Sequence, residues 1–387
     1  MNKTITVISD HFPSPGIPIY VFVQQLVFAL VDMGVKVNVV APQSLTHALF
    51  RGEKILPREF QAVSNHGNYF MVYRPYSISF GSGHKQLSKV VNNYNQKNLV
   101  RVLNRLNPEI LYGHFWYNAY RVSDYALEHN IPLFVACGEG DNAIEDLCKA
   151  LSVEKKQRLK NAVKGVISVS SENKRKSVQY GLAEDESIIV LPNCVDDALF
   201  HCSDGLAKRI ELGLSNKDFV ISFTGAFIHR KGSKTLSEAI KKINNSHIKT
   251  IFMGKPLAGD DCTPDCSGIV YMSSTEHEKI PELLAASDLF VLPTLNEGCC
   301  NAIVEALACG IPVVSSNRPF NDDILNDENS IAVNPESVDE IASAISLLMN
   351  DNALYSQKKK YVTEHSRDFS IFERAKKIYN FICERSS

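Results

Sequence analysis

The chain lacks the features that mark nucleic-acid-binding, secreted and membrane-spanning proteins. Its 41 basic and 43 acidic residues leave a formal charge of −2, so nothing global calls for a nucleic-acid partner and any anion site must be local. No run approaches the ~18 consecutive apolar residues of a membrane span. The first residues, MNKTITVISDHF, also lack the apolar core and cleavage site of a signal peptide. We therefore expect a cytoplasmic protein without a nucleic-acid partner, whose contact with a membrane is at most peripheral.

Cysteine patterns that would hold a metal or form a disulfide framework are missing as well. The ten cysteines are spread along the chain, several of them inside apolar patterns, which is typical of reduced thiols. Cys262 and Cys266 lie close together in CTPDC, but neither a second such pair nor a histidine at zinc-finger spacing accompanies them. A loop with two thiols is the better interpretation of this pair.

What the chain does have is the composition and length of two globular domains. Hydrophobic residues make up 44% and charged residues 22% of the 387 residues, which is ordinary for a folded protein. A chain of this length exceeds what one hydrophobic core usually supports. Two α/β domains of near-equal size are the natural expectation.

Short β-branched runs alternate with longer amphipathic stretches, a pattern typical of βαβ units and parallel sheets. Two sets of six predicted strands favour two doubly wound, Rossmann-like domains, residues 1–195 and 196–368. Such sheets bind ligands outside the carboxyl ends of their strands, so two that face each other would form a cleft. The predicted strands cover residues 5–9, 37–41, 110–112, 132–136, 166–169, 188–191, 220–224, 250–253, 269–272, 289–292, 312–315 and 331–333.

A long helical pattern over residues 84–106 carries five cations: Lys85, Lys89, Lys97, Arg101 and Arg105. At ~100° per residue these cations spread around much of the helix and do not form one stripe. A solvated face is therefore the better interpretation. A patch of the N-terminal domain that faces a membrane surface or an acceptor is the alternative.

The segment 289–316, LFVLPTLNEGCCNAIVEALACGIPVVSS, reads as strand, loop, helix, turn and strand. Its predicted helix begins near Cys299, and the unpaired NH groups at such an end, with the helix dipole, can hold a diphosphate. Gly298 would let the backbone approach that ligand closely. Glu297 and Glu305 flank this anion seat, and carboxylates can accept hydrogen bonds from the vicinal hydroxyls of a sugar.

A second segment, residues 219–240, places cations on another strand-to-helix loop. A buried strand ends at Gly225, Arg230 and Lys231 follow, and Ser233 occupies the position expected of a helix cap. Adjacent cations on such a loop can neutralise a departing diphosphate. On the dipeptide alone, a solvated turn would be the better interpretation.

Together these motifs resemble the large family of retaining GT-B glycosyltransferases, over roughly residues 1–350. The family's glutamate-x7-glutamate motif matches Glu297 through Glu305, and its glycine-to-lysine-glycine loop matches Gly225 through Lys231. ILYGHFWYNAY resembles its strand-end histidine loop and puts His114 at the active-site histidine. The resemblance implies a GT-B fold of two Rossmann-like domains, and a final helix, residues 369–387, that crosses back to the N-terminal acceptor-binding domain.

The resemblance also implies a role for each matched residue. Glu297 would bind the hydroxyls of the donor sugar, and Glu305 those of the ribose. His114 would lie beside the transferred sugar. The nucleobase would be recognised through backbone groups near Met272 and Ser273. The diphosphate would be held by five residues around the anion seat: Arg230, Lys231, Gly298, Cys300 and Asn301.

Three departures from the family pattern concern the phosphate grip and the acceptor side. Ala226 stands where the family usually has an arginine, for which Arg230 is a candidate replacement. The first loop, HFPSPGIPIYVF, has only Gly16 in place of the usual glycine pair. The common histidine-glycine-x-aspartate motif is replaced by Cys-Gly-Glu-Gly-Asp, which leaves Glu139 and Asp141 as acidic candidates near the acceptor hydroxyl.

An Asp-x-Asp triplet, with which enzymes of the other common transferase fold hold a divalent ion, does not occur. We therefore expect no metal and no cofactor beyond the donor itself. The resemblance implies transfer of a sugar from a UDP- or GDP-sugar to a glycan or lipid-linked acceptor, in the synthesis of a cell-surface polysaccharide or glycoconjugate. Two alternatives stay open: a nucleotide-sugar 2-epimerase of the same fold, and a non-catalytic nucleotide-sugar binding protein.

Overall fold

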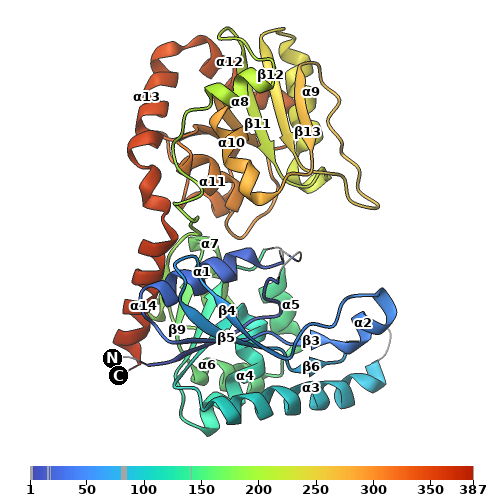
Figure 1. The fold of residues 1–387 in the computed structure, drawn as a ribbon, viewed down its shortest axis with the longest axis vertical. Coiled ribbons are helices and arrows are strands. Elements are labelled where there is room, and N and C mark those ends of the chain that lie inside the picture. The colour runs from blue at the N-terminus through green and yellow to red at the C-terminus, as the bar shows by residue number, and fades with distance from the viewer. Residues whose placement is uncertain (1–2, 15–16, 18, 80–84, 141, 387) are drawn as a thin grey trace. The chain divides into compact units, whose positions relative to one another are not determined.

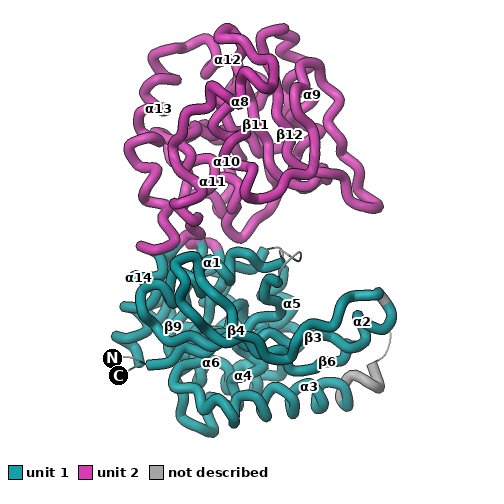
Figure 2. The backbone as a smooth tube through the Cα atoms, in the orientation of Figure 1, with its two compact units in different colours: residues 1–169, 173–191, 374–387 teal, residues 170–172, 192–373 magenta. Residues whose placement is uncertain are grey.

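The computed structural model describes residues 3–14, 17, 19–79, 85–140 and 142–386. The chain divides into two compact units (Figure 2). Unit 1 consists of residues 1–169, 173–191 and 374–387, and unit 2 of residues 170–172 and 192–373. The sequence placed the corresponding break at residues 195 and 196, and the start of the last helix at residue 369.

Unit 1 is built on an eight-stranded sheet, which is parallel except for its last pair. β1 and β7 lie side by side in its middle, and the chain adds strands outward from this pair in both directions. Strand order therefore reverses between β1 and β7, which makes their carboxyl ends the topological switch point. In sheet order the strands are β10 (Ile188–Val190), β9 (Val163–Ser168), β8 (Leu133–Cys137), β7 (Ile110–His114), β1 (Ile5–Ile8), β2 (Val37–Val40), β5 (Tyr69–Tyr73) and β4 (Glu59–Val63).

Helices and a small second sheet complete unit 1 (Figure 1). The second sheet pairs β3 (Gln43–Ser44) with β6 (Tyr76–Ser77), and it follows β2 and β5 directly in the chain. The helices are α1 (Val21–Asp32), α2 (Leu45–Arg51), α3 (Lys85–Leu106), α4 (Trp116–Glu128), α5 (Ala143–Ala150), α6 (Val153–Ala162), α7 (Ser171–Gln179) and, at the C-terminal end, α14 (Ile371–Arg385).

Unit 2 is a parallel six-stranded sheet in the order β13-β12-β11-β14-β15-β16. In chain order this is 3-2-1-4-5-6, the arrangement of the Rossmann fold, and its switch point lies between β11 and β14. The strands are β11 (Phe219–Thr224), β12 (Ile248–Met253), β13 (Ile269–Ser273), β14 (Leu289–Leu292), β15 (Val313–Ser316) and β16 (Ser330–Val333). The helices are α8 (Leu206–Glu211), α9 (Ser233–Ile243), α10 (Ile280–Ala285), α11 (Asn301–Ala308), α12 (Val338–Asn350) and α13 (Asn352–Glu364).

All twelve predicted strands are present, with ends shifted by a few residues, so the doubly wound architecture is confirmed. The central strands are buried on both faces, as LFVL and VVSS show in β14 and β15, which is why they read as continuous apolar runs. Ser233 was predicted to cap a helix, and this is wrong. Gly232 is the N-cap of α9, and Ser233 is its first helical residue, whose hydroxyl donates to the carbonyl of Cys262 at 2.7 Å.

Helix α14 begins in unit 2 and continues into unit 1. Within unit 1, Ala375, Ile378 and Ile382 are completely buried. The ring of Phe381 lies 6.3 Å from that of Phe134 on β8, so the buried face of this helix packs on the sheet of unit 1. Across the described residues, no helix is both long and apolar enough to span a bilayer.

Candidate functional site

In unit 2, the loops after β11 and β14 meet at the switch point. The first loop makes a 3-10 turn over His229–Lys231 before α9 starts. Its Arg230 carbonyl accepts a hydrogen bond from the backbone of Leu295 at 2.8 Å, and the hydroxyl oxygen of Thr294 lies 3.2 Å from the same carbonyl oxygen. These contacts fix the cationic turn against the loop that carries Glu297.

One carboxylate oxygen of Glu297 collects three donors. Lys231 Nζ lies 2.5 Å from it, the Thr294 hydroxyl 2.8 Å and an Arg230 guanidinium nitrogen 3.1 Å. Arg230 also donates to the carbonyl of Asn296 at 2.7 Å. The Glu297 side chain is 14% exposed, so this cluster of Glu297, Lys231, Arg230 and Thr294 is mostly shielded from water but still open to a ligand. We call it the Glu297 cluster.

The electrostatics keep Lys231 charged. Burial is the largest influence on its pKa and would lower it, but the negative charge of Glu297 and the hydrogen bond to it favour the protonated amine, and the pKa lies above its ordinary value. A buried ammonium that stays protonated can stabilise negative charge strongly, because little water screens it. The Glu297 cluster thus holds two cations beside one carboxylate.

The N-terminus of α11 lies on the same loop. Cys300 is its N-cap and makes no capping bond with its side chain, so the first NH groups of the helix receive no side-chain cap from it. Burial raises the pKa of the Cys300 thiol to about 11, against an opposing effect of Lys231, so this thiol is uncharged. Asn301 is the first helical residue, and its side-chain oxygen accepts a hydrogen bond from Asn193 at 2.8 Å. Gly298 is buried in the preceding loop.

Glu305 lies one turn further into α11 and is nearly buried. His277, in the 3-10 turn His277–Lys279 after β13, has its Nε2 atom 3.1 Å from a carboxylate oxygen of Glu305. This hydrogen bond is the main reason why the pKa of His277 is raised, against a lowering by burial. The same imidazole packs at 5.0 Å from the ring of Phe200.

Met272 and Ser273, the residues expected near the nucleobase, end strand β13 and are exposed. The carbonyl of Ser273 accepts a hydrogen bond from the backbone of Gly254 at 2.8 Å. Since β13 and β11 are parallel strands of one sheet, their carboxyl ends lie at the same edge. The expected donor residues of unit 2 are therefore gathered along the carboxyl ends of its strands.

In unit 1, His114 is the last residue of β7, at the switch point. Its side chain is 8% exposed, and among the described residues no partner reaches its Nδ1 atom. Burial, with a smaller contribution from the charge of Arg374, lowers the pKa of His114 to about 3, so the imidazole is neutral. Its carbonyl accepts a hydrogen bond from the Asn118 side chain at 2.8 Å, which leaves the ring as the more available group.

Two neighbours of His114 are also unusual. Phe115 has φ 75° and ψ 152°, a backbone conformation that costs a bulky residue energy and is found mainly at functional sites. Glu139 follows the adjacent strand β8; one of its oxygens accepts the NH of Trp116, and the other is buried with no hydrogen-bond donor among the residues that the structure describes. Burial raises the pKa of Glu139. Gly16 and Asp141, the other two acceptor-side candidates, lie outside the described residues.

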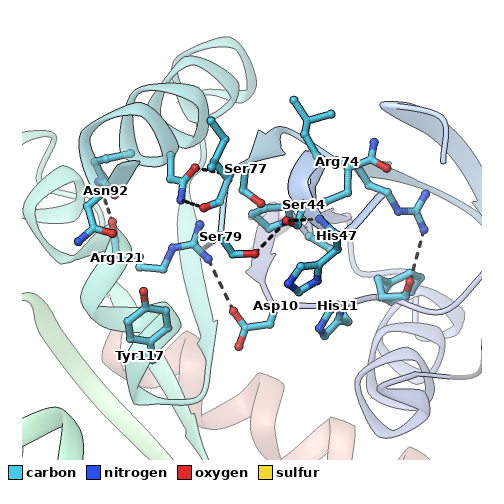
Figure 3. Close-up of a pocket in the computed structure, with 18 of the residues that line it drawn as sticks. Asp10, His11, Ser44, His47, Arg74, Ser77, Ser79, Asn92, Tyr117 and Arg121 are labelled. Atoms are coloured by element: carbon cyan, nitrogen blue, oxygen red, sulfur yellow. Dashed lines mark hydrogen bonds and ion pairs between the residues drawn. The ribbon is translucent and has the colours of Figure 1, made fainter. Parts of the chain in front are cut away.

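A cavity of about 1300 Å³ opens at the carboxyl ends of β1 and β2 in unit 1 (Figure 3). Asp10 and His11 line it from the loop after β1, Ser44 and His47 from β3 and α2, and Arg121 from α4. Sequence reasoning missed this cavity, because its lining comes from loops and helix faces that are far apart in the chain. It also missed Thr294 and His277, which carry no motif.

These features define an α/β protein with two doubly wound units, each with polar and charged side chains at its switch point. Comparison with solved structures confirms the GT-B fold predicted from the sequence. The chain is similar to sucrose-phosphate synthase from Thermosynechococcus elongatus, with a TM-score of 0.76 and 15% identity over 99% of this chain and 98% of the other. It is also similar to Anabaena HepE in complex with UDP-glucose, with a TM-score of 0.71 and 16% identity over 99% and 100%.

The family resemblance is confirmed as well: residues 218–351 match the model of the family glycosyl transferases group 1. One curated relative is the UDP-Gal:alpha-D-GlcNAc-diphosphoundecaprenol alpha-1,3-galactosyltransferase of Escherichia coli, 28% identical over 55% of this chain. Another is the capsular polysaccharide biosynthesis glycosyltransferase CapM of Staphylococcus aureus, 25% identical over 57%. The aligned part spans 58% and 62% of these relatives' own lengths.

Proposed function

We propose that this protein is a retaining, metal-independent glycosyltransferase that moves a sugar from a UDP- or GDP-sugar to a glycan or lipid-linked acceptor. The Glu297 cluster is the observation that carries the proposal. It unites, at one switch point, a carboxylate suited to sugar hydroxyls and two cations suited to a leaving diphosphate. The family match and the activities for which the two relatives are named favour a role in the synthesis of a cell-surface polysaccharide or glycoconjugate.

In the structure, Lys231 and Arg230 are paired with Glu297. A bound diphosphate would compete for these cations, and the NH groups at the start of α11 would add donors to its oxygens. Glu297 would then accept hydrogen bonds from the sugar. As the bond between sugar and phosphate breaks, the cations would stabilise the charge that develops on the leaving group, so the chemistry has no need of a metal ion.

In unit 1, the neutral imidazole of His114 would lie beside the transferred sugar. A ring with a pKa of about 3 stays uncharged at working pH, so it can contribute a hydrogen bond without repelling an oxocarbenium-like centre. Glu139, whose pKa is raised, is our candidate for the group near the acceptor hydroxyl.

Peripheral contact with a membrane is part of the proposal, since a lipid-linked acceptor would lie there. Leu49 and Phe50 on α2 are 76% and 75% exposed, an unusual degree of exposure for two adjacent large apolar residues. Cosedimentation with vesicles that contain anionic lipid tests this part, and binding is expected to weaken when both residues are changed to Ser.

A donor screen followed by a turnover assay tests the proposal as a whole. A nucleotide sugar at 100 times its Kd is expected to stabilise the protein by about 2.7 kcal/mol, and UDP-sugars are the first choice because the Escherichia coli relative is named for UDP-Gal. Transfer is expected to persist in excess EDTA, and NMR of the product is expected to show the anomeric configuration of the donor. Loss of activity in EDTA with rescue by Mn²⁺, or an inverted product, would contradict the mechanism.

The same assay separates the two alternatives. A 2-epimerase would convert the nucleotide sugar to its epimer without any acceptor, and a non-catalytic binding protein would bind the donor without turnover. The presence of two cations and a sugar-facing carboxylate in one cluster favours transfer, because a protein that only binds needs no stabilisation of a leaving group.

A further inference from the structure

The residues that line the cavity of unit 1 are far in the sequence from those of the Glu297 cluster, and their side chains are of different chemical types. Its volume of about 1300 Å³ exceeds the ~300–1,000 Å³ typical of a pocket for one small ligand. Side chains with neutral hydrogen-bonding groups dominate its polar lining, among them Ser44, Ser79 and Asn92. They outnumber the three carboxylates of the lining, Asp10, Glu53 and Asp124.

The two arginines of this lining are poorly placed to bind a phosphate. Arg74 is buried; its guanidinium donates to Ser14 at 2.7 Å and lies 4.3 Å from the ring centre of Phe60, and burial lowers its pKa to about 10. Arg121 faces Asp10 at 3.7 Å. The charged side chains of the lining nearly cancel. Three carboxylates stand against four cations, which are Lys54, Arg74, Arg121 and Lys155. The Glu297 cluster, in contrast, has two adjacent cations for one carboxylate.

Asp10 and Arg121 point toward one another across the cavity, and Tyr117 lies beside them (Figure 3). Their separation of 3.7 Å is longer than the ~3.2 Å limit of a good hydrogen bond, and both side chains are partly exposed. Such a pair contributes little to stability, so a ligand can insert between its members at little cost. A sugar hydroxyl suits this position, because it can donate to Asp10 and accept from Arg121.

Aromatic rings add a surface for the apolar face of a sugar. The ring of Tyr117 is exposed, and that of Tyr120 lies in the same lining. An amphipathic aromatic side chain offers both apolar contact area and a hydroxyl. Neutral hydrogen-bonding groups, a charged pair that can bind a hydroxyl, and the exposed ring of Tyr117 together match a carbohydrate better than a phosphate-bearing head group.

From this lining we infer that the cavity binds an uncharged oligosaccharide of two or more sugar units as the acceptor, and that Asp10, Arg121 and Tyr117 determine its recognition. The inference rests on the proposed transferase function and narrows its acceptor from a glycan or lipid-linked molecule to an uncharged glycan segment. In this proposal unit 2 binds the diphosphate, and the cavity of unit 1 binds the hydroxyl groups of the glycan.

The full-length protein can be tested on an array of neutral and phosphate-bearing glycans of one to four sugar units, followed by titration calorimetry with a soluble glycan that binds. We expect neutral glycans of at least two units to bind, and Asp10→Asn, Arg121→Ala or Tyr117→Ala to weaken binding by about tenfold or more. Arg105→Ala is the matched control. Arg105 forms an exposed pair with Glu59 in unit 1 but does not line the cavity, so its loss is expected to change affinity by less than about twofold.

Nucleotide-sugar binding, measured on the same wild-type preparation, separates the failure of this inference from that of the proposed function. If UDP- or GDP-sugars bind but no neutral glycan does, or if only phosphate-bearing glycans bind, the inference is overturned while the transferase proposal stands. Unchanged affinity in the correctly folded Asp10→Asn and Arg121→Ala variants would overturn the location of the site. If no nucleotide sugar binds at all, the proposed function itself fails.

Discussion

At the scale of single residues, the Glu297 cluster allows a carboxylate to be changed with little change in shape. Glu297→Gln keeps the size of the side chain but removes the charge that holds Lys231 and Arg230. We expect turnover to fall by about 100-fold, because the contacts to the sugar are weakened. Affinity for the free nucleoside diphosphate is expected to stay equal or to rise, because both cations are released to the diphosphate.

Steady-state kinetics and calorimetry with the nucleoside diphosphate check this pair of effects. Glu364→Gln is the matched control, because Glu364 forms an exposed pair with Lys360 at 3.9 Å on α13. If Glu297→Gln turns over like wild type, Glu297 does not bind the donor sugar.

His277 and Glu305 form the second residue pair with a measurable consequence. We predict that His277 positions the Glu305 carboxylate for the ribose, since its Nε2 atom holds one carboxylate oxygen at 3.1 Å. His277→Ala should then weaken binding of UDP, or of GDP if that is the nucleotide that binds, by about 5–10-fold. The charged groups around His277, namely Glu305, Glu278 and Asp196, all favour its protonated form.

A nucleotide without ribose hydroxyls distinguishes this positioning role from a structural one. With the 2′,3′-dideoxy form of the same nucleotide, wild type and His277→Ala are expected to bind equally well, because Glu305 has no ribose hydroxyl to accept from. An equal loss with both nucleotides would mean that His277 supports only the local fold.

His114 makes the stability of unit 1 depend on pH. Its pKa is lowered to about 3 in the folded protein, whereas an unfolded histidine titrates near ~6.5. Between these values the unfolded state binds one more proton, so stability falls as pH falls, by up to about 1.4 kcal/mol per pH unit. We expect His114→Gln to unfold with a shallower pH dependence between about pH 4.5 and 6.5.

The single tryptophan, Trp116, makes the measurement specific. It is buried in unit 1, so urea titrations followed by its fluorescence report the unfolding of that unit. If the free energy of unfolding changes equally with pH in the variant and in wild type, His114 takes up its proton in the folded state as well.

At the scale of elements, the loop that carries Arg230 and Lys231 depends on one glycine. Gly232 has φ 74°, and a Cβ atom there would lie 2.3 Å from the carbonyl oxygen of Pro293. Gly232→Ala would therefore strain the backbone and push apart the two loops that form the Glu297 cluster. Gly259 has φ 87°, but a Cβ atom there would meet no described atom within 4 Å, so this position has the strain without the clash.

We expect Gly259→Ala to cost about 1 kcal/mol of unfolding free energy, and Gly232→Ala to cost clearly more and to abolish most turnover. Chemical denaturation and the transfer assay measure both effects. If both substitutions lower the free energy of unfolding equally, the loop can move away from Pro293 without loss of stability.

The strands could be predicted from the sequence because doubly wound sheets bury them on both faces, which leaves clear apolar runs. The antiparallel hairpin of β4 and β5 was missed. Its strands EFQAV and YFMVY alternate in burial along the chain and flank the turn segment Ser64–Asn68, so the signal was visible but lay between stronger parallel units. The two-residue strands β3 and β6 are too short to leave any pattern.

The motifs placed Arg230 and Lys231 on the loop after β11, Glu297 on the loop after β14 and Glu305 within the helix that follows, and the structure has them there. They could not predict that Lys231 and Glu297 touch, because 66 residues separate them and only the order of strands in the sheet brings them together. For the same reason His277, which contacts Glu305 across 28 residues, had no signal in the sequence.

At the scale of the whole molecule, unit 1 is completed by residues from the far end of the chain. Ile378→Ala on α14 removes a completely buried side chain and is expected to cost unit 1 about 2–5 kcal/mol. Lys377→Ala, one residue earlier and exposed, is expected to change stability by less than about 0.5 kcal/mol. Trp116 fluorescence measures unit 1, and nucleotide binding, expected to be unchanged, reports on unit 2. A wild-type transition in Ile378→Ala would contradict this account of α14.

The position of residues 374–387 within unit 1 also has a consequence during synthesis. When residue 191 leaves the ribosome, unit 1 still lacks the helix that covers Gly165 and Phe134. Translation at ~5–20 residues per second delays that helix by about 10–40 s. Unit 2 has all its residues before α14 is finished, so the domain that begins first is completed last, and until then its uncovered strands are open to chaperones and to other nascent chains.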